Sequence, residues 1–262
     1  MTLTLYHNAM STCSAKVRMV LSAKGLKWEG VHLDLRSGDQ QKPDYVKLNP
    51  NRVVPTLVHD EAVIIESIVI CEYLDDAFSE QPVRPNDLVE RAKMRLWTKQ
   101  LDEGVHGATS IISNCIAFRY QHLQKTPEAI ETYLNNVVDP IRRERLRRMI
   151  ELGMDAPDFE DGVRRFEKLL DDMEAALEHG PWLSGNEFSL ADISYASYMA
   201  RLQHLGFEER IAARPRTAEW AARLMERPSY KQGIEAWFDP KYLSLFESQR
   251  EAAKSKISSM VS

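Results

Sequence analysis

A short polar segment near the N-terminus, Asn8-Ala9-Met10-Ser11-Thr12-Cys13-Ser14, carries the side chains best suited to chemistry. A helical pattern follows it, and the partial positive charge at a helix N-terminus lowers the pKa of a thiol and stabilises a thiolate. The hydroxyl of Ser11 could donate a hydrogen bond to the thiolate of a bound molecule. The thiol of Cys13 could instead act itself and form a mixed disulfide. In a third interpretation neither residue acts: Cys13 is a small buried side chain, and Thr12 or Ser14 merely caps the helix.

The stretch from Val53 to Phe78 offers the second group of candidate residues. Two apolar runs, separated by four polar or small residues, are typical of a β-hairpin. A cis bond before Pro55, at the start of the first strand, would leave the backbone N–H and C=O of Val54 free. Glu66 and Ser67 then begin a helix, where free N–H groups favour a carboxylate ligand, and Glu66 could hold an ammonium group. This pattern predicts a site for a small zwitterionic peptide; the simpler alternative is that Ser67 only caps the helix.

The elements that position these residues follow from periodicity. Thr2–Tyr6 alternates as a strand, a helix ends at Gly25, and a second strand contains Val31, Leu33 and Leu35. Such a βαβ unit crosses over right-handedly into a parallel strand pair. Residues 37–48 are expected to be irregular or weakly helical before the hairpin and its helix, which ends near Phe78.

No strand pattern is present after the proline-containing segment 79–87. We expect one long, bent helix over 88–115, a helix begun by Thr126-Pro127, and another with a stripe over 163–177 that ends at Gly180. Ser189-Leu190-Ala191-Asp192 resembles a capping box. The basic run 142–148 is expected to be a solvated helix face. The polar tail after Trp237 is expected to fray or to pack late.

Composition excludes several classes of protein. The 262 residues, 44% of them hydrophobic, are enough for one large or two small domains. A net charge of −5 argues against binding to nucleic acid or an anionic membrane. We expect no signal peptide and no transmembrane helix. The three cysteines are few and scattered, which suits a reducing cytoplasm, and neither a Cys-x-x-Cys motif nor a metal-ligand spacing is present.

Two motifs together resemble the cytosolic glutathione S-transferases. Val54-Pro55-Thr56-Leu57 followed by Glu66-Ser67-x-x-Ile70-x-x-Tyr73-Leu74 is similar to their glutathione-binding half. Trp182-Leu183-Ser184-Gly185 before the capping box is similar to their helical half. The resemblance implies a thioredoxin-like α/β domain with a mixed four-stranded sheet over residues 1–80 and a linker over 81–87. It also implies an all-α domain over 88–262 that carries an electrophile pocket, glutathione as cosubstrate, and a homodimer.

The resemblance also assigns roles to residues. Val54, before the cis proline Pro55, would pair with the cysteinyl backbone of glutathione, while Glu66 and Ser67 would hold its γ-glutamyl end. Lys42 and Gln41 lie about where the family contacts the glycine carboxylate, with Arg52 nearby, although an exposed basic side chain is often merely solvated. On the long helix, one group of side chains could line the second-substrate pocket or could simply be core: His106, Ile111, Ile112, Cys115 and Phe118.

The first loop is similar to two branches of the family that use it differently. Ser-Ser-Cys-Ser in zeta-class transferases, where the first serine works, maps to Ser11. Ser-x-Cys-Ser in a bacterial hydroquinone reductive dehalogenase, where the cysteine is essential, maps to Cys13. We predict Ser11 as the primary residue and Cys13 as a secondary one.

Residues 69–76 and 91–99 resemble the bacterial glutathione-dependent β-aryl-ether cleaving enzymes. We therefore expect a glutathione transferase that acts on a hydrophobic, aromatic electrophile, in degradation of aromatic compounds or in detoxification. Ether cleavage and reductive dehalogenation are alternatives within the same chemistry. A non-catalytic binding protein of the same fold is the alternative of another class, and Val54-Pro55 and Glu66-Ser67 argue against it.

Overall fold

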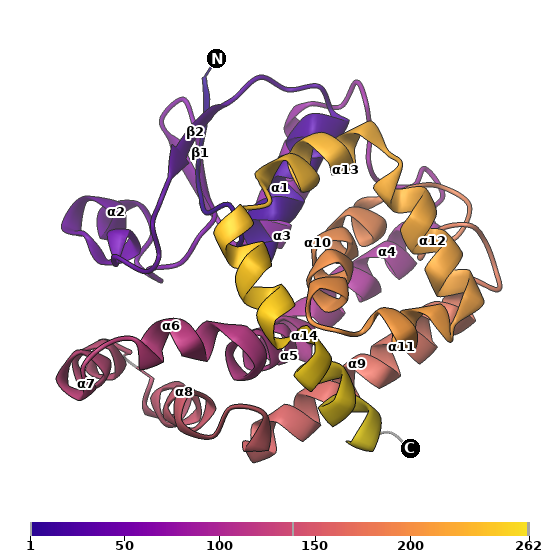
Figure 1. Cartoon of the computed structure of the whole chain (residues 1–262). Helices are drawn as coiled ribbons and strands as arrows, with labels where there is room; N and C mark the ends of the chain where they lie inside the picture. Colours follow the sequence, from indigo (N-terminus) through magenta and orange to yellow (C-terminus); the bar gives the residue numbers. More distant parts are fainter. Residues whose placement is uncertain (1, 138, 261–262) are drawn as a thin grey trace. The chain divides into compact units, whose positions relative to one another are not determined.

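The computed structural model describes residues 2–137 and 139–260. Their contacts form two compact units. Figure 1 shows the chain in colours that follow the sequence. The first unit contains the residues up to Thr98 together with 176–200 and 218–239. The second contains residues 99–175 and 201–217 and those from Pro240 on. Two later segments of the chain thus pack with the N-terminal residues.

The first unit is built on a four-stranded mixed sheet in the order β2-β1-β3-β4, as predicted. Its strands are β1 Leu3–His7, β2 Glu29–His32, β3 Thr56–His59 and β4 Ala62–Ile65. β1 and β2 are parallel, while β1–β3 and β3–β4 are antiparallel. The β1–β2 connection runs through helix α1, because parallel strands need a long crossover.

The helices of the chain are α1 Thr12–Ala23, α2 Pro43–Leu48, α3 Ser67–Ala77, α4 Leu88–Gln100, α5 His106–Ser113, α6 Arg119–Leu123, α7 Pro127–Asn135, α8 Pro140–Leu152, α9 Pro157–Ala176, α10 Leu190–His204, α11 Glu208–Ala212, α12 Pro215–Met225, α13 Pro228–Gly233 and α14 Pro240–Met260.

Helices cover both faces of the sheet, because successive side chains of β1 point to opposite sides. Leu3, Leu5 and His7 are buried on one face, where α1 and α3 pack against each other. Tyr6 points to the other face, where Tyr45 of α2 belongs to a small apolar cluster with Leu33 and Val54. Figure 1 shows α2 and the pair α1–α3 on either side of strands β1 and β2.

Helix α13 lies closely against α1. A Cβ atom at Gly233 would come within 2.6 Å of the backbone of Met19, so only glycine permits this approach. Arg18 reinforces the contact, since its Nε donates to the carbonyl oxygen of Gly233 at 3.0 Å. The C-terminal segment 228–233 is therefore part of the structure that holds α1 in place.

The capping box at the start of α10 forms as predicted. The backbone N–H of Ser189 donates to Asp192 at 2.9 Å, and the Ser189 hydroxyl accepts from the N–H of Ala191 at 3.2 Å. Asp192 also accepts from the N–H of Leu183 at 3.0 Å and from the indole of Trp220 at 2.9 Å. Burial raises the pKa of this carboxyl, although its hydrogen bonds work in the opposite direction. Asp192 thus joins three segments of the first unit.

The helix predicted over 88–115 is present but interrupted. Most of α4 belongs to the first unit, and in the second unit π turns at Leu101–Val105 and Asn114–Phe118 flank α5. Gly104, at a φ of 146°, marks the first interruption. Thr126 caps α7, accepting from Ala129, with Pro127 in the first turn. The basic run lies on α8, where Arg147 and Arg148 are half-buried and pair with Glu131 and Asp158, respectively.

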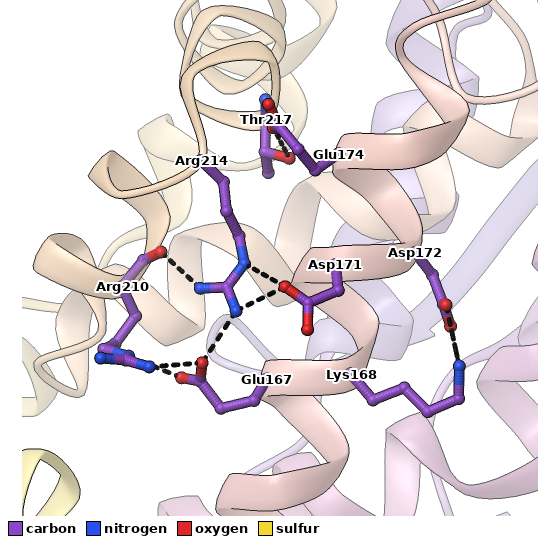
Figure 2. Close-up of polar contacts among 8 residues, drawn as sticks. All are labelled: Glu167, Lys168, Asp171, Asp172, Glu174, Arg210, Arg214 and Thr217. Carbon is purple, nitrogen blue, oxygen red and sulfur yellow. Dashed lines mark hydrogen bonds and ion pairs between the residues drawn. The ribbon is translucent and has the colours of Figure 1, made fainter. Parts of the chain in front are cut away.

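Figure 2 shows how α9 is bound to the segment that follows α10. Arg210 donates two hydrogen bonds to Glu167, at 2.8 and 2.7 Å. Arg214 donates to Glu167 at 2.9 Å and to Asp171 at 2.8 Å. Glu167 and Asp171 on this face of α9 therefore both have an arginine partner.

Three sequence expectations need correction. The second strand is Glu29–His32, so Leu33 and Leu35 follow it rather than belong to it; all four strand residues are exposed, and hydrophobic alternation therefore did not locate the strand. The helix of the Val163 stripe ends at Ala176, before Gly180. The tail after Trp237 is not frayed: helix α14 buries Phe246, Ala253 and Ile257 in the second unit.

Candidate functional site

The register of the sheet brings the predicted site segments to one edge. Tyr6 of β1 lies opposite Thr56 of β3, and Thr56 lies opposite Ile65 of β4. The loop after β1, the Val54-Pro55 segment before β3, and Glu66 after β4 therefore start from adjacent positions. Neighbouring strands are about 4.8 Å apart, so the three segments begin within about 10 Å of one another.

Ser11 caps helix α1. Its hydroxyl oxygen accepts a hydrogen bond from the N–H of Ser14 at 3.2 Å, and its carbonyl accepts from Ala15 at 2.9 Å. Thr12 and Ser14 are buried and do not cap, which corrects the interpretation in which one of them serves as the cap. Because capping uses only a lone pair of the Ser11 oxygen, its O–H proton can still be donated to a ligand.

Cys13 lies in the first turn of α1 and is half-exposed, so it is not the buried side chain of the third interpretation. Its Sγ lies 3.8 Å from the hydroxyl of Tyr198 on α10, a distance at which either group can donate. The neighbouring Ser197 donates from its hydroxyl to the carbonyl of Thr12 at 2.9 Å. Helix α10 therefore fixes the start of α1 beside the thiol.

Arg18 holds the loop that leads to Ser11. Its guanidinium donates to the carbonyls of Asn8 and Ala9, each at 3.0 Å. The same group lies over the ring of Trp237 at 4.8 Å. Burial lowers the pKa of Arg18 to about 9, and that value keeps the side chain charged near neutral pH. A buried cation thus determines the path of the loop.

The Val54–Pro55 peptide bond is cis, as predicted. The turn before it is fixed by Asn49, whose Nδ2 donates to the carbonyl of Val53 and to the Thr56 hydroxyl, each at 3.0 Å. Within residues 2–137 and 139–260, no hydrogen bond engages the backbone of Val54. Its N–H and C=O can therefore bind an extended ligand as an added strand would.

Glu66 and Ser67 lie at the start of α3, as predicted. Glu66 occupies the N-cap position with a φ of 67°, a conformation that residues with side chains rarely adopt. Such strain is commonly retained at binding sites. The carboxylate of Glu66 accepts from Nδ2 of Asn51 at 3.1 Å, which orients it. Ser67 is buried in the first helical turn, where the unpaired N–H groups of a helix favour an anion.

Lys42 differs from the other candidates, because its side chain is 71% exposed and pairs with Asp39 at 2.7 Å. The hydrogen bond to Asp39 raises the pKa of Lys42. Lys42 precedes α2, on the segment that returns from β2. Among the described residues, the polar contact of its side chain is thus with Asp39 and not with Val54, Glu66 or Ser67.

His7 and Trp237 pack beside Arg18, the residue that holds the first loop. His7, in β1, packs edge-on against Trp237 with ring centroids 4.8 Å apart. Burial lowers the pKa of His7 to about 3, and the charges of Arg18 and His32 act in the same direction. His7 is therefore neutral at physiological pH, and it lies 3.3 Å from the Arg18 guanidinium.

The residues proposed for a second-substrate pocket divide into two groups. Ile112 and Cys115 are buried, and Gly162 of α9 packs against Ile112, so these two belong to the core of the second unit. His106 is exposed, and Ile111 and Phe118 are half-buried.

In the described part of the chain, no group of histidine, cysteine, aspartate or glutamate side chains could hold a metal ion.

Sequence reasoning missed Arg18, Tyr198 and Asn51 as site residues. Arg18 interrupts the apolar run Val17–Leu21 and could have been found from that interruption. Tyr198 lies 185 residues from Cys13, so no local pattern connects them.

None of the described helices is long and apolar enough to cross a membrane.

Two family models match this chain. The glutathione S-transferase N-terminal domain matches residues 1–76, and the glutathione S-transferase C-terminal domain matches residues 142–223. The first match contains the segments at the sheet edge, and the second contains Tyr198 and the capping box of α10.

Similar proteins of known name agree with these matches. Protein LigF of Sphingobium sp. strain SYK-6 is 32% identical, over 90% of this chain and 94% of LigF. Glutathione S-transferase TCHQD of Arabidopsis thaliana is 29% identical, over 90% of each chain. The crystal structure of β-etherase LigF matches with a TM-score of 0.82 over 90% of this chain and all of that one. Glutathione transferase F7 of Populus trichocarpa, 26% identical, matches with a TM-score of 0.71 over 91% of this chain and all of that one.

The sheet-edge site and the matches to both domains therefore lead to one conclusion: the chain belongs to the glutathione S-transferase family, and it is a glutathione transferase with glutathione as its cosubstrate.

Proposed function

We propose that this transferase joins the thiolate of glutathione to a hydrophobic, aromatic electrophile, or displaces a leaving group from it. The observation that carries the proposal is the register Tyr6–Thr56–Ile65, which starts all three site segments at one sheet edge. Such a site offers an N–H and a C=O from one extended residue, an anion pocket and a carboxylate. Glutathione presents a matching backbone, carboxylate and ammonium.

Each site residue has a distinct role in binding glutathione. The backbone of Val54, before Pro55, pairs with the cysteinyl residue of glutathione. Ser67 and the helix N-terminus receive the γ-glutamyl carboxylate, and Glu66 receives the ammonium group. Lys42 contacts the glycine carboxylate from the rim, where solvent weakens the attraction. Glutathione is thereby held in one orientation, with its thiol toward the first loop.

In the chemical step, Ser11 donates its free O–H to the sulfur of glutathione and stabilises the thiolate. The proton leaves to solvent, and the sulfur attacks the electrophilic carbon. A C–S bond forms while the bond to the leaving group breaks. Holding two reactants together supplies a large part of the rate, and a higher thiolate fraction near neutral pH supplies more. Cys13 is the secondary residue.

The likeness to LigF favours aromatic ethers as electrophiles, since its structure is described as that of a β-etherase. In that reaction the C–O bond of the ether breaks and a phenolate leaves. Reductive dehalogenation of aromatic compounds is the alternative, because it would use the thiol of Cys13 and this thiol is half-exposed. Both reactions belong to the degradation of aromatic compounds, and simple conjugation would serve detoxification.

We also propose the domain limits expected from the sequence, with residues 1–80 binding glutathione, 81–87 linking, and 88–262 carrying the electrophile pocket. We propose that the protein works as a homodimer in the cytoplasm. Support for a second copy comes from exposed apolar side chains in the first unit, at Val69 on α3 and at Leu88, Val89 and Leu96 on α4. A Leu96→Glu variant that stayed the same size in solution as the wild type would count against a dimer through α4.

Calorimetric titration with glutathione tests the site. Ser67→Ala and Glu66→Ala should each weaken binding by roughly 1–3 kcal/mol, the value of a lost charge-assisted contact. Ser37→Ala and Glu61→Ala, which change residues of the same unit outside the site, should bind as the wild type does. Undiminished affinity in both site variants would reject the site.

A turnover screen tests the reaction. Glutathione is supplied with β-aryl ethers, halogenated hydroquinones or a chloro-nitro-arene, and wild type is compared with Ser11→Ala and Cys13→Ser. We expect Ser11→Ala to move the rate profile to higher pH with every substrate. The assignment of Ser11 fails if this variant keeps the wild-type rate and profile while Cys13→Ser is inactive with all three classes.

A further inference from the structure

Helix α1 and its C-cap contain three buried cations that differ in their partners. Lys16 and Arg18 are 1% exposed, and Lys24 is 6% exposed. Lys24 pairs with Asp75 at 2.7 Å, and Arg18 donates to three backbone carbonyls. In the described part of the chain, the ammonium of Lys16 has neither a carboxylate nor a hydrogen-bond acceptor; it lies 5.6 Å from the ring centroid of Tyr198. An ammonium that is largely removed from water and has no anion beside it is unfavourable, so a negative charge nearby would stabilise it.

The group placed to supply that charge is the thiol of Cys13. Cys13 lies three residues before Lys16, and residues at this spacing share a helix face. Both side chains contact Tyr198, Cys13 through the hydroxyl at 3.8 Å and Lys16 through the ring. Both also act electrostatically on Cys71 of α3, which places the three groups in one neighbourhood. The cluster combines a thiol, a cation and a phenol.

We propose that Lys16 and Tyr198 are positioning residues that hold Cys13 as a thiolate in the free enzyme. Lys16 supplies the compensating positive charge, and the Tyr198 hydroxyl donates to the sulfur. The inference goes beyond the proposed glutathione contacts, because neither residue is among those proposed to bind glutathione. It rests on the proposed function only in taking Cys13 as a working residue.

Other charged and titratable groups near α1 are already engaged. On α3, burial raises the pKa of Cys71 to about 12, so Cys71 stays protonated, and Glu72 pairs with Arg95 at 3.4 Å. On α13, burial raises the pKa of Tyr230, and Lys231 pairs with Glu226 at 2.8 Å. Arg18 is committed to the loop carbonyls. Among the described residues, Lys16 is therefore the cation of α1 whose side chain has no hydrogen-bond acceptor of its own.

A thiolate at Cys13 would attack disulfides as well as carbon electrophiles. With glutathione disulfide, a bond forms between Sγ of Cys13 and one glutathione sulfur, the original S–S bond breaks, and the other glutathione leaves as a thiolate. The exchange needs no further oxidant or reductant. The chemical class of partner for this thiolate is thus a small, accessible disulfide.

The test measures the alkylation rate of Cys13 by iodoacetamide from pH 5 to 10, without glutathione, by mass spectrometry of the Cys13 peptide. In the wild type we expect the half-maximal rate about one pH unit below the roughly 8.5 of a free thiol. Lys16→Met should raise that midpoint by about one unit, and the rate at pH 6 should fall roughly tenfold. Lys16→Arg should restore most of the rate, and Tyr198→Phe should raise the midpoint by less. The exposed Lys27→Met is the control and should leave it unchanged.

An unchanged midpoint in Lys16→Met would overturn the proposal, and so would an equal displacement in Lys16→Met and Lys16→Arg, because both would deny a role to the charge. If Lys16→Met does not fold, Tyr198→Phe decides, since phenylalanine keeps the ring and removes only the hydroxyl. An unchanged midpoint in Tyr198→Phe then rejects the cluster. Because the probe is not glutathione, none of these outcomes depends on the glutathione site.

Discussion

Helices α9 and α1 both remove charged side chains from water, but they balance that charge differently. On α9, in the second unit, Glu167 is bonded by Arg210 and Arg214, and Asp171 by Arg214 (Figure 2). Arg210 and Glu167 are joined by two parallel hydrogen bonds, and this bidentate geometry gives an ion pair its largest stabilisation. This network joins α9 to α11 and to the start of α12, and its function is structural.

On α1, in the first unit, the charges are matched at one end of the helix and unmatched at the other. Lys24, in the C-cap position, has Asp75, while Lys16 and Arg18, nearer the N-terminus, have no carboxylate partner among the described residues. The unmatched charges lie on the half of the helix that follows Ser11 and Cys13. Burial lowers the pKa of Arg18, and groups with perturbed pKa values gather at functional sites. The comparison indicates that α9 uses charge for stability and that α1 keeps positive charge available for a thiolate.

The largest effect is expected from Arg18→Met. The variant leaves the carbonyls of Asn8, Ala9 and Gly233 without their donor, and unsatisfied buried groups cost roughly 1–3 kcal/mol each. We expect the free energy of unfolding in urea to fall by about 3 kcal/mol or more, and kcat/KM to fall with it. Arg18→Lys keeps the charge without the planar guanidinium and should recover only a part of both. Wild-type stability in Arg18→Met would remove Arg18 from the comparison.

A smaller effect is expected from the pH dependence of stability at His7. Burial lowers its folded-state pKa to about 3, with Arg18 and His32 acting in the same direction. Below pH 6.5, the ordinary pKa of histidine, His7 binds a proton in the unfolded chain but stays neutral in the folded protein. The stabilisation is therefore complete above pH 6.5 and is lost as pH falls toward 3, at about 1.4 kcal/mol per pH unit.

Urea unfolding at pH 7 and pH 5 measures this slope. We expect His7→Phe to remove about 2 kcal/mol of the loss between the two pH values. His204, whose pKa burial lowers to about 4, keeps its share of the slope in the variant. Equal slopes in wild type and His7→Phe would show that His7 is not the group that titrates.

Local patterns predicted the residues at the sheet edge because each depends on its near neighbours in sequence. Pro55 fixes its own backbone, Glu66 and Ser67 come just before an apolar helical stripe, and Ser11 comes just before another. These features required no knowledge of distant contacts. The mixed four-stranded sheet, in contrast, was implied by the resemblance to the glutathione S-transferases, because the pairing of β1 with β3 joins residues far apart in the sequence.

The rest depends on contacts that periodicity cannot reveal. Arg18 bonds to Gly233, 215 residues away, and Tyr198 meets Cys13 from a helix whose residues 190–202 are largely buried. Strand β2 is exposed on both faces. Its position is therefore determined by the pairing of its backbone with β1 and not by the burial of its side chains. The C-terminal helix α14 buries only widely spaced residues, a pattern that resembles a polar tail.

The smallest effect is expected on α9, where two neighbouring residues form a matched test. Glu167 is buried between two arginines, whereas the Lys168 side chain is 67% exposed and pairs with Asp172 at 2.8 Å (Figure 2). Burial alone would raise the pKa of Glu167, but the bonds from Arg210 and Arg214 outweigh it, so the pKa is lowered. The stabilisation is therefore present above pH 4.5, the pKa of an unperturbed glutamate, and is lost as pH falls through the pKa of Glu167 in the folded protein.

Glu167→Gln should cost about 1–2 kcal/mol of unfolding free energy at pH 7, and Lys168→Ala no more than about 0.5 kcal/mol. Neither should change the alkylation profile of Cys13, because the charge on α9 is balanced within its own network. Equal losses in the two variants would mean that the buried pairs contribute no more than an exposed one. A displaced alkylation profile would mean that the two helices do not divide stability and chemistry between them.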